Sequence, residues 1–341
     1  MSWGIIGHGW AIESLRRSIA EQRVAHAYLI SGSAQLGKAL LALRLAQALN
    51  CERGEADACL ECRACRRIER GNHPDVRIAG MATQTAGLKP EEALRQRDLR
   101  IDTIREWQRD ITLRPYEGRQ RVLILHDAER LNDASSNAML KTLEEPPAYA
   151  TLILVANTAG DLLPTIVSRC RPLKLRPVPR AEIAQALQER YMLNPADAHM
   201  LAVWSAGRPG WAIQMVQSPD ALEERQAQLD TLISLSELPR AQAFRWAEEQ
   251  AKHFRSDQRE VYAMLELWQS WWRDMLMYAS GCEQAIVFVD RRSELERYAR
   301  RYQLADIHGC VQRIGTAAQR MRENLNPQLA LEHVLLHMPQ H

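Results

Sequence analysis

The sequence feature that most restricts the fold is a glycine-containing loop between an apolar stretch and a helical one. Residues 32–38 (GSAQLGK) follow the apolar run 27–31 (AYLIS) and open the leucine- and alanine-rich segment 38–50. In the pattern G-x-x-x-x-G-K-[ST], the glycines let backbone amides curl around phosphates, and the lysine reaches the terminal phosphates. The spacing therefore predicts a strand, a phosphate loop and a helix in this order. The candidate nucleotide contacts are Gly32, Gly37 and Lys38.

The rest of the nucleotide site departs from the pattern of an active ATPase. Ala39 stands where a Ser or Thr hydroxyl would bind Mg²⁺. Asp127, after the apolar run 121–125, suits a metal ligand, but Ala128 stands where a water-activating glutamate is expected. Glu129 comes one residue later, and in an extended segment it would point to the opposite side. Metal binding and water activation are both central to phosphoryl transfer, so we expect no ATP hydrolysis by this chain alone.

Two interpretations of the loop stay open. It is either a structural relic that holds the turn from strand to helix, or a weak ATP or ADP site without turnover.

Strand-like and helix-like segments alternate through the first 170 residues. Buried strands are predicted at 27–31, 121–125 and 151–156, and helices at 38–50, 101–113 and 133–145, the last with Asp133 as its cap. This alternation predicts an α/β domain with a mostly parallel sheet flanked by helices. Residues 81–100 have little apolar content and are expected to form an exposed, mobile loop.

The remainder of the chain is predicted to be helical. Prolines cluster at 172–180 and indicate a boundary, and long helical patterns replace the strand signals from about residue 219. Leu265, Trp268, Trp272 and Met275 recur at i, i+3, i+7 and i+10, which makes one helical stripe. A core within the domain explains this stripe, although part of such an aromatic face could instead pack on a neighbouring subunit.

Charge and hydropathy argue against several function classes. The chain has 44 basic and 42 acidic residues and a net charge of +2, whereas dedicated nucleic-acid binders show a basic surplus or a basic face. A zinc-dependent nucleic-acid-binding module is therefore the least favoured interpretation. The first residues lack a signal-peptide pattern, and no apolar run is long enough to span a bilayer. We expect a cytoplasmic protein that does not interact with membranes.

Four of the seven cysteines cluster directly after the phosphate-loop helix. They are Cys51, Cys59, Cys62 and Cys65. Four thiolates at short spacing suit tetrahedral Zn²⁺, and a site with four protein ligands is closed and structural. In a chain without a secretory signal, a tight cluster indicates a metal site more than a disulfide framework. The alternative is four thiols without a metal.

Three strings together resemble the bacterial clamp-loader branch of the AAA+ ATPases. They are the four-cysteine insertion, residues 131–147 (LNDASSNAMLKTLEEPP) and residues 165–170 (TIVSRC). The resemblance covers about residues 1–215 well and the helical C-terminal part only by general architecture. It implies an AAA+ P-loop domain with a zinc-binding insertion at 1–172, a small helical lid at 173–214 and an all-α collar domain for oligomerisation at 215–341.

The resemblance also implies roles for single residues. Arg169 would act in trans as an arginine finger at the ATP site of a neighbouring subunit, where its permanent charge stabilises the transferring phosphoryl group. The alternative is that Arg169 pairs with a local carboxylate or a helix C-terminus. Asn157 would lie beside the phosphate, and Arg208 would be a nucleotide sensor or merely a contact at a helix start. Cys170 is expected to pack rather than react.

The implied assembly is a hetero-pentamer with gamma/tau and delta clamp-loader subunits, which acts on a sliding clamp and primed DNA. In this family the gamma/tau motor subunits keep the hydroxyl and the glutamate that Ala39 and Ala128 replace. The leading hypothesis is therefore a non-hydrolysing clamp-loader subunit, and the alternative is an ATP-hydrolysing motor of the gamma/tau type.

Overall fold

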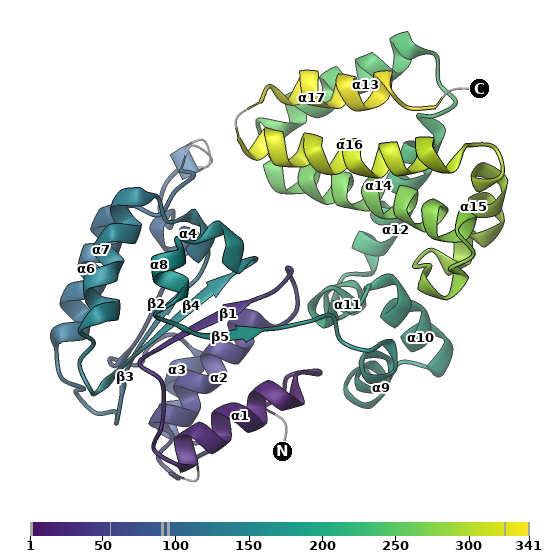
Figure 1. Ribbon diagram of the computed structural model, residues 1–341. Coiled ribbons are helices and arrows are strands. Elements are labelled where there is room, and N and C mark those ends of the chain that lie inside the picture. The colour runs from purple at the N-terminus through teal and green to yellow at the C-terminus, as the bar shows by residue number, and fades with distance from the viewer. Residues whose placement is uncertain (1–2, 55, 90–91, 94–95, 324, 340–341) are drawn as a thin grey trace. The chain divides into compact units, whose positions relative to one another are not determined.

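The computed structural model describes residues 3–54, 56–89, 92–93, 96–323 and 325–339 (Figure 1). The chain divides into two units. The first comprises residues 1–198 and 207–211, and the second comprises 199–206 and 212–341. The three-domain division expected from the sequence stays a prediction.

Five parallel strands form the sheet of the first unit, in the order β2-β3-β4-β1-β5 (Figure 1). Their bounds are β1 (Ala27–Ser31), β2 (Val76–Ala79), β3 (Arg121–Leu125), β4 (Ala150–Ala156) and β5 (Arg171–Lys174). Strand β1 pairs with β4 on one side and β5 on the other. The glycine loop therefore begins at the carboxyl end of an inner strand, beside the end of β4, where ligands of open parallel sheets bind.

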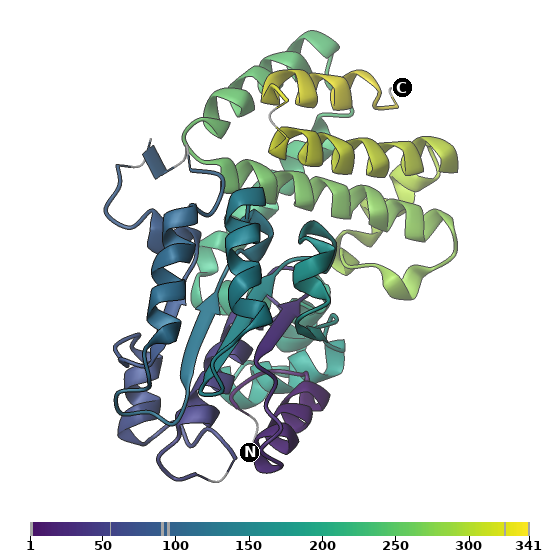
Figure 2. The ribbon, with the colours of Figure 1, turned by 60° about the vertical axis from the view of Figure 1, so that its left-hand side comes forward.

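Helices cover both faces of this sheet, which explains why its strands are unbroken apolar runs. Tyr28 and Ile30 of β1 belong to an apolar cluster with α1 (Gly9–Ala20) and α2 (Lys38–Asn50). Leu29 belongs to a second cluster, with α6 (Ile101–Thr112) and α7 (Asp133–Glu144), which lie side by side (Figure 2). Alternate residues of one strand thus serve two separate cores.

The first unit has further helices and turns among the described residues. They are α3 (Arg63–Glu69), α4 (Met81–Gln84), α8 (Pro164–Val167), α9 (Arg180–Tyr191) and the 3₁₀ turns Ala128–Arg130 and Ala159–Asp161. Helices α10 (Pro195–Trp204) and α11 (Pro209–Gln217) contribute residues to both units.

The predicted α/β fold class is confirmed, and three local expectations are corrected. Helix α7 is capped by Asn132, whose side chain accepts a hydrogen bond from the Ser135 backbone, and not by Asp133. Strand β5 extends into the proline-rich stretch 172–180 that was expected to mark a boundary, and it ends at Lys174. Residues 81–100 contain α4 and the fully buried Leu99, whose N–H donates to the carbonyl of Arg130 at 2.8 Å. Residues 90–91 and 94–95 of that predicted loop lie outside the described residues.

The second unit is helical, as predicted. Its helices are α12 (Pro219–Ser234), α13 (Arg240–Phe254), α14 (Gln258–Ala279), α15 (Arg292–Ala299), α16 (Leu304–Arg322) and α17 (Pro327–Leu336). The predicted stripe lies on α14, and all four of its side chains are buried. Trp268 meets Trp246 of α13 edge to face, with ring centroids 6.0 Å apart. The stripe is therefore the core of this unit. Among the described residues, no helix has both the length and the apolar character that a membrane span requires.

Candidate functional site

The phosphate loop has the backbone that its glycines predict. Gly32 and Gly37 have φ angles of 147° and 90°, and Gln35 between them has φ 63°. A Cβ at Gly32 would lie 2.7 Å from the Leu175 carbonyl oxygen, so only glycine fits there. Lys38 is the first residue of α2, as in the motif.

The Lys38 side chain is buried and makes three hydrogen bonds. Its Nζ donates to the carbonyl oxygens of Gly32 at 2.6 Å and Ser33 at 2.7 Å, and to Oδ1 of Asn157 at 3.0 Å. Burial lowers the pKa of Lys38, and the negative charges of Glu129 and Asp127 partly oppose this effect. The structure thus brings together Gly32, Lys38 and Asn157, three residues that the sequence motifs had singled out.

Glu129 also belongs to this cluster, contrary to the expectation that it would point away. Asp127 has φ 55°, and the chain then turns into the 3₁₀ segment Ala128–Arg130 instead of staying extended. This turn brings Oε1 of Glu129 to 2.5 Å from Nδ2 of Asn157. The prediction failed because side-chain alternation holds only in extended backbone.

The donor set does not fit a magnesium–ATP centre. Ala39 lies exposed in the first turn of α2 and offers no oxygen ligand. Ala128 is buried in the apolar cluster beneath α6 and α7. Oδ2 of Asp127 accepts a hydrogen bond from the Met81 backbone at 3.1 Å, at the start of α4. The hydroxyl ligand for magnesium and the water-activating glutamate are therefore both missing at their expected positions, although Asp127 is retained.

Two contacts that sequence reasoning missed close the outer side of the loop. The N–H of Gly210, in the first turn of α11, donates to the carbonyl of Gln35 at 2.9 Å. The Nε2 atom of the buried His8 lies 3.0 Å from the carbonyl oxygen of Leu36. Arg208 directly precedes α11, and its role as a sensor stays a prediction.

The four clustered cysteines form a second candidate site. Cys51 ends α2, Cys62 caps the start of α3, and the four Sγ atoms all lie within 4.8 Å of one another. With zinc–sulfur bonds of about 2.3 Å, the sulfurs of a tetrahedral site lie about 3.8 Å apart, so only a small contraction is needed. The Sγ atoms of Cys59 and Cys65 are already 3.9 Å apart. The arrangement can hold a metal ion, and a structural zinc is consistent with it.

Backbone amides favour the thiolate form of Cys59 in this cluster, whereas burial raises the pKa of Cys65. The N–H of Cys62 donates to Sγ of Cys59 at 3.3 Å, and the N–H of Cys65 donates to Sγ of Cys62 at 3.4 Å. Burial alone would raise the pKa of Cys59, but hydrogen bonds from the Cys62 and Glu61 amides lower it to about 7. Metal ligands must be deprotonated thiolates, so these amides support metal binding.

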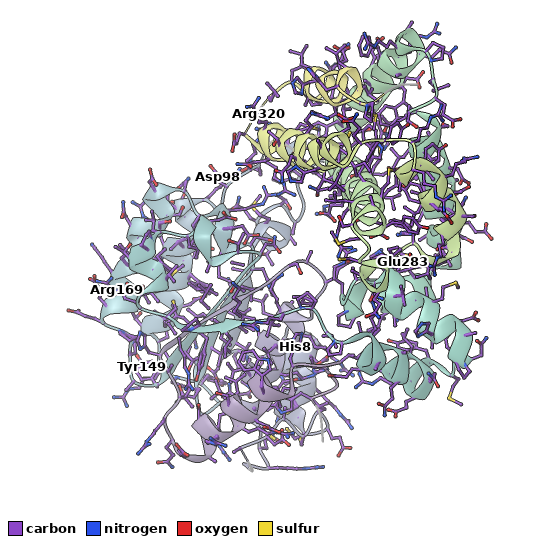
Figure 3. All side chains as sticks on the ribbon, turned by 45° about the vertical axis from the view of Figure 1, so that its right-hand side comes forward. His8, Asp98, Tyr149, Arg169, Glu283 and Arg320 are labelled. Carbon is purple, nitrogen blue, oxygen red and sulfur yellow. The ribbon has the colours of Figure 1, made fainter. Side chains whose placement is uncertain are left out.

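Arg169 lies at the surface of the first unit, directly after α8 (Figure 3). Its side chain is 35% exposed. Nη2 donates to Oε1 of Glu144 at 2.7 Å, and Nη1 donates to the Thr165 carbonyl at 3.0 Å. Within the single chain Arg169 thus pairs with a local carboxylate and a helix carbonyl. Its action at another subunit stays a prediction.

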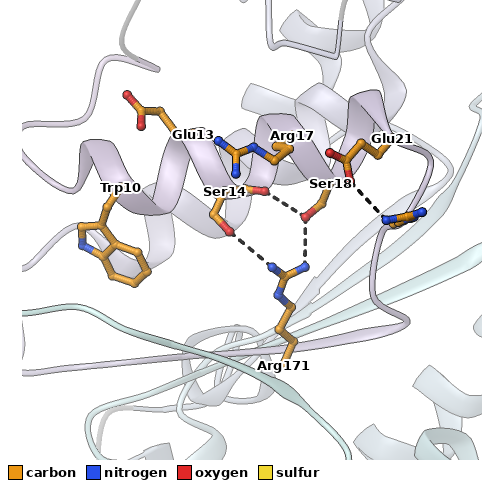
Figure 4. A pocket seen from close by; sticks show the side chains of 8 residues that line it. Trp10, Glu13, Ser14, Arg17, Ser18, Glu21 and Arg171 are labelled. Carbon is orange, nitrogen blue, oxygen red and sulfur yellow. Dashed lines mark hydrogen bonds and ion pairs between the residues drawn. The ribbon is translucent and has the colours of Figure 1, made fainter.

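The residues after Arg169 have structural roles. Cys170 is buried in the apolar cluster of α6 and α7, and burial raises its pKa to about 12, so its thiol is inert. Arg171 donates to Oγ of Ser18 at 2.9 Å and of Ser14 at 3.3 Å, which attaches β5 to α1. The side chains of Arg171, Ser14 and Ser18 line a surface hollow of about 420 Å³ (Figure 4).

Known proteins match this chain along most of its length. Residues 7–179 match the family described as "DNA polymerase III, delta subunit", and residues 219–340 match "DNA polymerase III, delta subunit, C terminal". The DNA polymerase III subunit delta′ of Bacillus subtilis (strain 168) is 27% identical over 322 residues, which cover 94% of this chain and 93% of that protein.

Two further relatives match over shorter stretches. The subunit delta′ of Pseudomonas aeruginosa is 37% identical over 192 residues, or 54% of each chain. The subunit tau/gamma of Haemophilus influenzae is 33% identical over 184 residues, which are 54% of this chain and 25% of that protein. The match to delta′ of Bacillus subtilis includes both units, whereas the tau/gamma match spans about half of this chain. The chain therefore belongs to the DNA polymerase III delta subunit family, on its delta′ branch.

Proposed function

We propose that this chain is a non-hydrolysing delta′ subunit of the clamp loader, which supplies Arg169 to the ATP site of a neighbouring gamma/tau-type subunit. One observation carries this proposal. The chain's own nucleotide site has Ala39 and Ala128 where catalysis needs a hydroxyl and a glutamate, yet Arg169 stands at the surface. The proposed partners are gamma/tau and delta subunits in a hetero-pentamer that loads the sliding clamp onto primed DNA in the cytoplasm.

The contacts of Arg169 leave it able to act on a neighbour. Its pair with Glu144 is a surface ion pair, because the two side chains are 35% and 50% exposed. Such pairs contribute about 0–1 kcal/mol, so exchanging Glu144 for a phosphate group costs little. A guanidinium that approaches the transferring phosphoryl group can raise the rate at that site on the order of 10³–10⁵-fold.

The test is a reconstituted complex with gamma/tau and delta subunits that carries Arg169→Ala. We expect clamp- and DNA-stimulated ATPase to fall because the site served by this subunit loses its finger, with little recovery in Arg169→Lys. The matched control is Arg77→Ala, since Arg77 is 63% exposed and lies on β2, at the opposite edge of the sheet from β5. A wild-type ATPase rate with Arg169→Ala in an intact complex would exclude the proposed role.

We also propose that Cys51, Cys59, Cys62 and Cys65 bind one structural Zn²⁺. The close sulfur atoms and the two amide-to-sulfur hydrogen bonds support this assignment. The three-part division at 1–172, 173–214 and 215–341, with the last part as an oligomerisation collar, is retained as part of the proposal.

The second candidate function is an ATP-hydrolysing motor of the gamma/tau type. The retained Gly32, Gly37 and Lys38 and the 33% identity to a tau/gamma subunit favour it, and the missing catalytic side chains oppose it. The two functions differ in the isolated chain. Turnover of ATP above the rate of a Lys38→Ala variant would support the motor, whereas equal background rates support the non-hydrolysing subunit.

A further inference from the structure

The phosphate loop of this protein takes part in a continuous series of polar contacts. It runs from the ammonium group of Lys38 through the amide of Asn157 to the carboxylate of Glu129. The orientation of the amide is set by its neighbours, because an ammonium only donates hydrogen bonds and an ionised carboxylate only accepts them. Oδ1 of Asn157 therefore faces Lys38, and Nδ2 faces Glu129.

Every hydrogen bond that the ammonium group of Lys38 can donate goes to another group of this protein. An ammonium group has three N–H donors, and the carbonyls of Gly32 and Ser33 and the side chain of Asn157 take one each. In a loaded phosphate loop this ammonium contacts the terminal phosphates instead. A phosphate group can enter only if Lys38 gives up some of these bonds.

Glu129 supplies the negative charge that a nucleotide would otherwise bring. Its Oε1 atom binds Asn157, and its Oε2 atom is buried without a hydrogen-bond partner among the described residues. Glu129 is half-buried, and taking a charged oxygen out of water favours a compensating positive charge. Lys38 is the cation at the other end of this series of contacts. The negative charge of the Glu129 carboxylate would also repel a phosphate group that approached Lys38.

We propose that Glu129 is a built-in anion that, through Asn157, keeps Lys38 bound to the loop's own carbonyls and thereby excludes the phosphates of a nucleoside di- or triphosphate. The contact acts on the phosphates through Lys38, whereas Ala39 and Ala128 remove groups that serve the metal ion and the attacking water. It exists because the 3₁₀ turn after Asp127 directs Glu129 toward the end of β4. The proposal does not depend on the role of Arg169.

Calorimetric titration of the full chain with ADP tests this proposal. We expect the wild-type chain to show no measurable binding of ADP. The Glu129→Ala variant should bind ADP with a dissociation constant at least tenfold below the highest value that the titration can detect. Lys38→Ala in the Glu129→Ala background should abolish the gain, because the freed ammonium is the group that captures the phosphates. Glu106→Ala, an exposed position on α6, is the matched control and should behave like wild type.

Two results would overturn the proposal. One is a folded Glu129→Ala chain that binds ADP no better than wild type, and the other is a wild-type chain that already binds ADP in a Lys38-dependent way. If Glu129→Ala fails to fold, Glu129→Gln keeps the test decisive, because it removes the charge while leaving an oxygen that can accept from Asn157. These outcomes are separate from the clamp-loader ATPase, since they are measured on the isolated chain.

Discussion

The carboxylate of Asp75 holds the loop that leads into β3. Its Oδ1 atom accepts from the Tyr116 backbone at 2.7 Å and from Arg121 at 3.1 Å, and its Oδ2 atom accepts from the backbones of Glu117 at 2.9 Å and Gly118 at 2.7 Å. Burial alone would raise the pKa of Asp75, but the three backbone N–H groups hold it below its ordinary value. The ionised form is therefore the form that the fold selects.

Replacing Asp75 by asparagine should destabilise the first unit. Both oxygens face N–H donors, so the amide N–H₂ of Asn must oppose donors in either orientation. We expect a loss of about 3–5 kcal/mol in the free energy of unfolding at pH 7, as for a broken buried ion pair. Urea unfolding followed by circular dichroism measures it, with the 80% exposed Asp102→Asn as control.

The loss of stability caused by Asp75→Asn should depend on pH. Because the folded pKa is lowered, the stabilisation by Asp75 is present above the ordinary carboxyl pKa of about 3.9 and disappears as the pH falls through the lower folded value. The difference between wild type and Asp75→Asn should therefore narrow in acid. If Asp75→Asn unfolded at the same urea concentration as wild type at pH 7, this would contradict the stabilising role of the carboxylate.

Sequence reasoning worked where the signal was local. The phosphate loop and the cysteine cluster are recognised within a few residues, and β1, α2 and β3 begin and end where their apolar periodicity predicts. It failed for Glu129, because the left-handed Asp127 that redirects it has no motif of its own. It could not find the bonds of Asp75, because the loop that donates them lies about 40 residues along the chain.

Among the elements, the cysteine insertion is tied to the rest of the unit by two polar side chains. The fully buried Gln47 of α2 donates to the carbonyl of Cys65 at 2.8 Å. Asp57 accepts hydrogen bonds from the Trp3 indole and from Arg16 of α1. The short helix α3 has only seven residues and cannot be stable alone, so tertiary contacts such as these must hold it.

We therefore predict that zinc orders the insertion without building the sheet. Purified protein should contain one zinc per chain under reducing conditions, measured by elemental analysis. Cys59→Ser should lose the metal and expose residues 52–69 to protease. The sheet should stay protected, because Ala58 and Ile68 are, among the described residues of this segment, the only buried ones in the sheet's two apolar clusters. Cys282→Ser, at an exposed cysteine, should keep its zinc. Metal-free wild-type protein with an equally protected insertion would refute the structural role.

For the whole molecule, the separate cores of the two units predict separate responses to pH. Asp274 of α14 is the counterpart of Asp75 in the second unit, and it is also fully buried. Its Oδ2 atom accepts from the backbones of Val287 at 2.6 Å and Phe288 at 2.8 Å, whereas Oδ1 accepts from Arg273, which is 45% exposed, at 3.0 Å. Burial raises the pKa of Asp274 despite these contacts. Folding of the second unit thus shifts Asp274 toward its protonated form relative to the unfolded chain.

The stability change with pH should accordingly have opposite signs in the two units. A raised folded pKa gives a contribution that is complete below the unfolded value and is lost as the pH rises through the folded one. Asp274→Asn mimics the protonated acid, since its oxygen can accept both backbone N–H groups while Arg273 turns to solvent. We expect this variant to be at least as stable as wild type at pH 7 and to lose the pH dependence of the second unit only.

Peptide-resolved hydrogen exchange in urea distinguishes the units, with the exposed Asp306→Asn as control. Destabilisation of the second unit by Asp274→Asn at pH 7 would show that the ionised carboxylate is required there, as it is at Asp75.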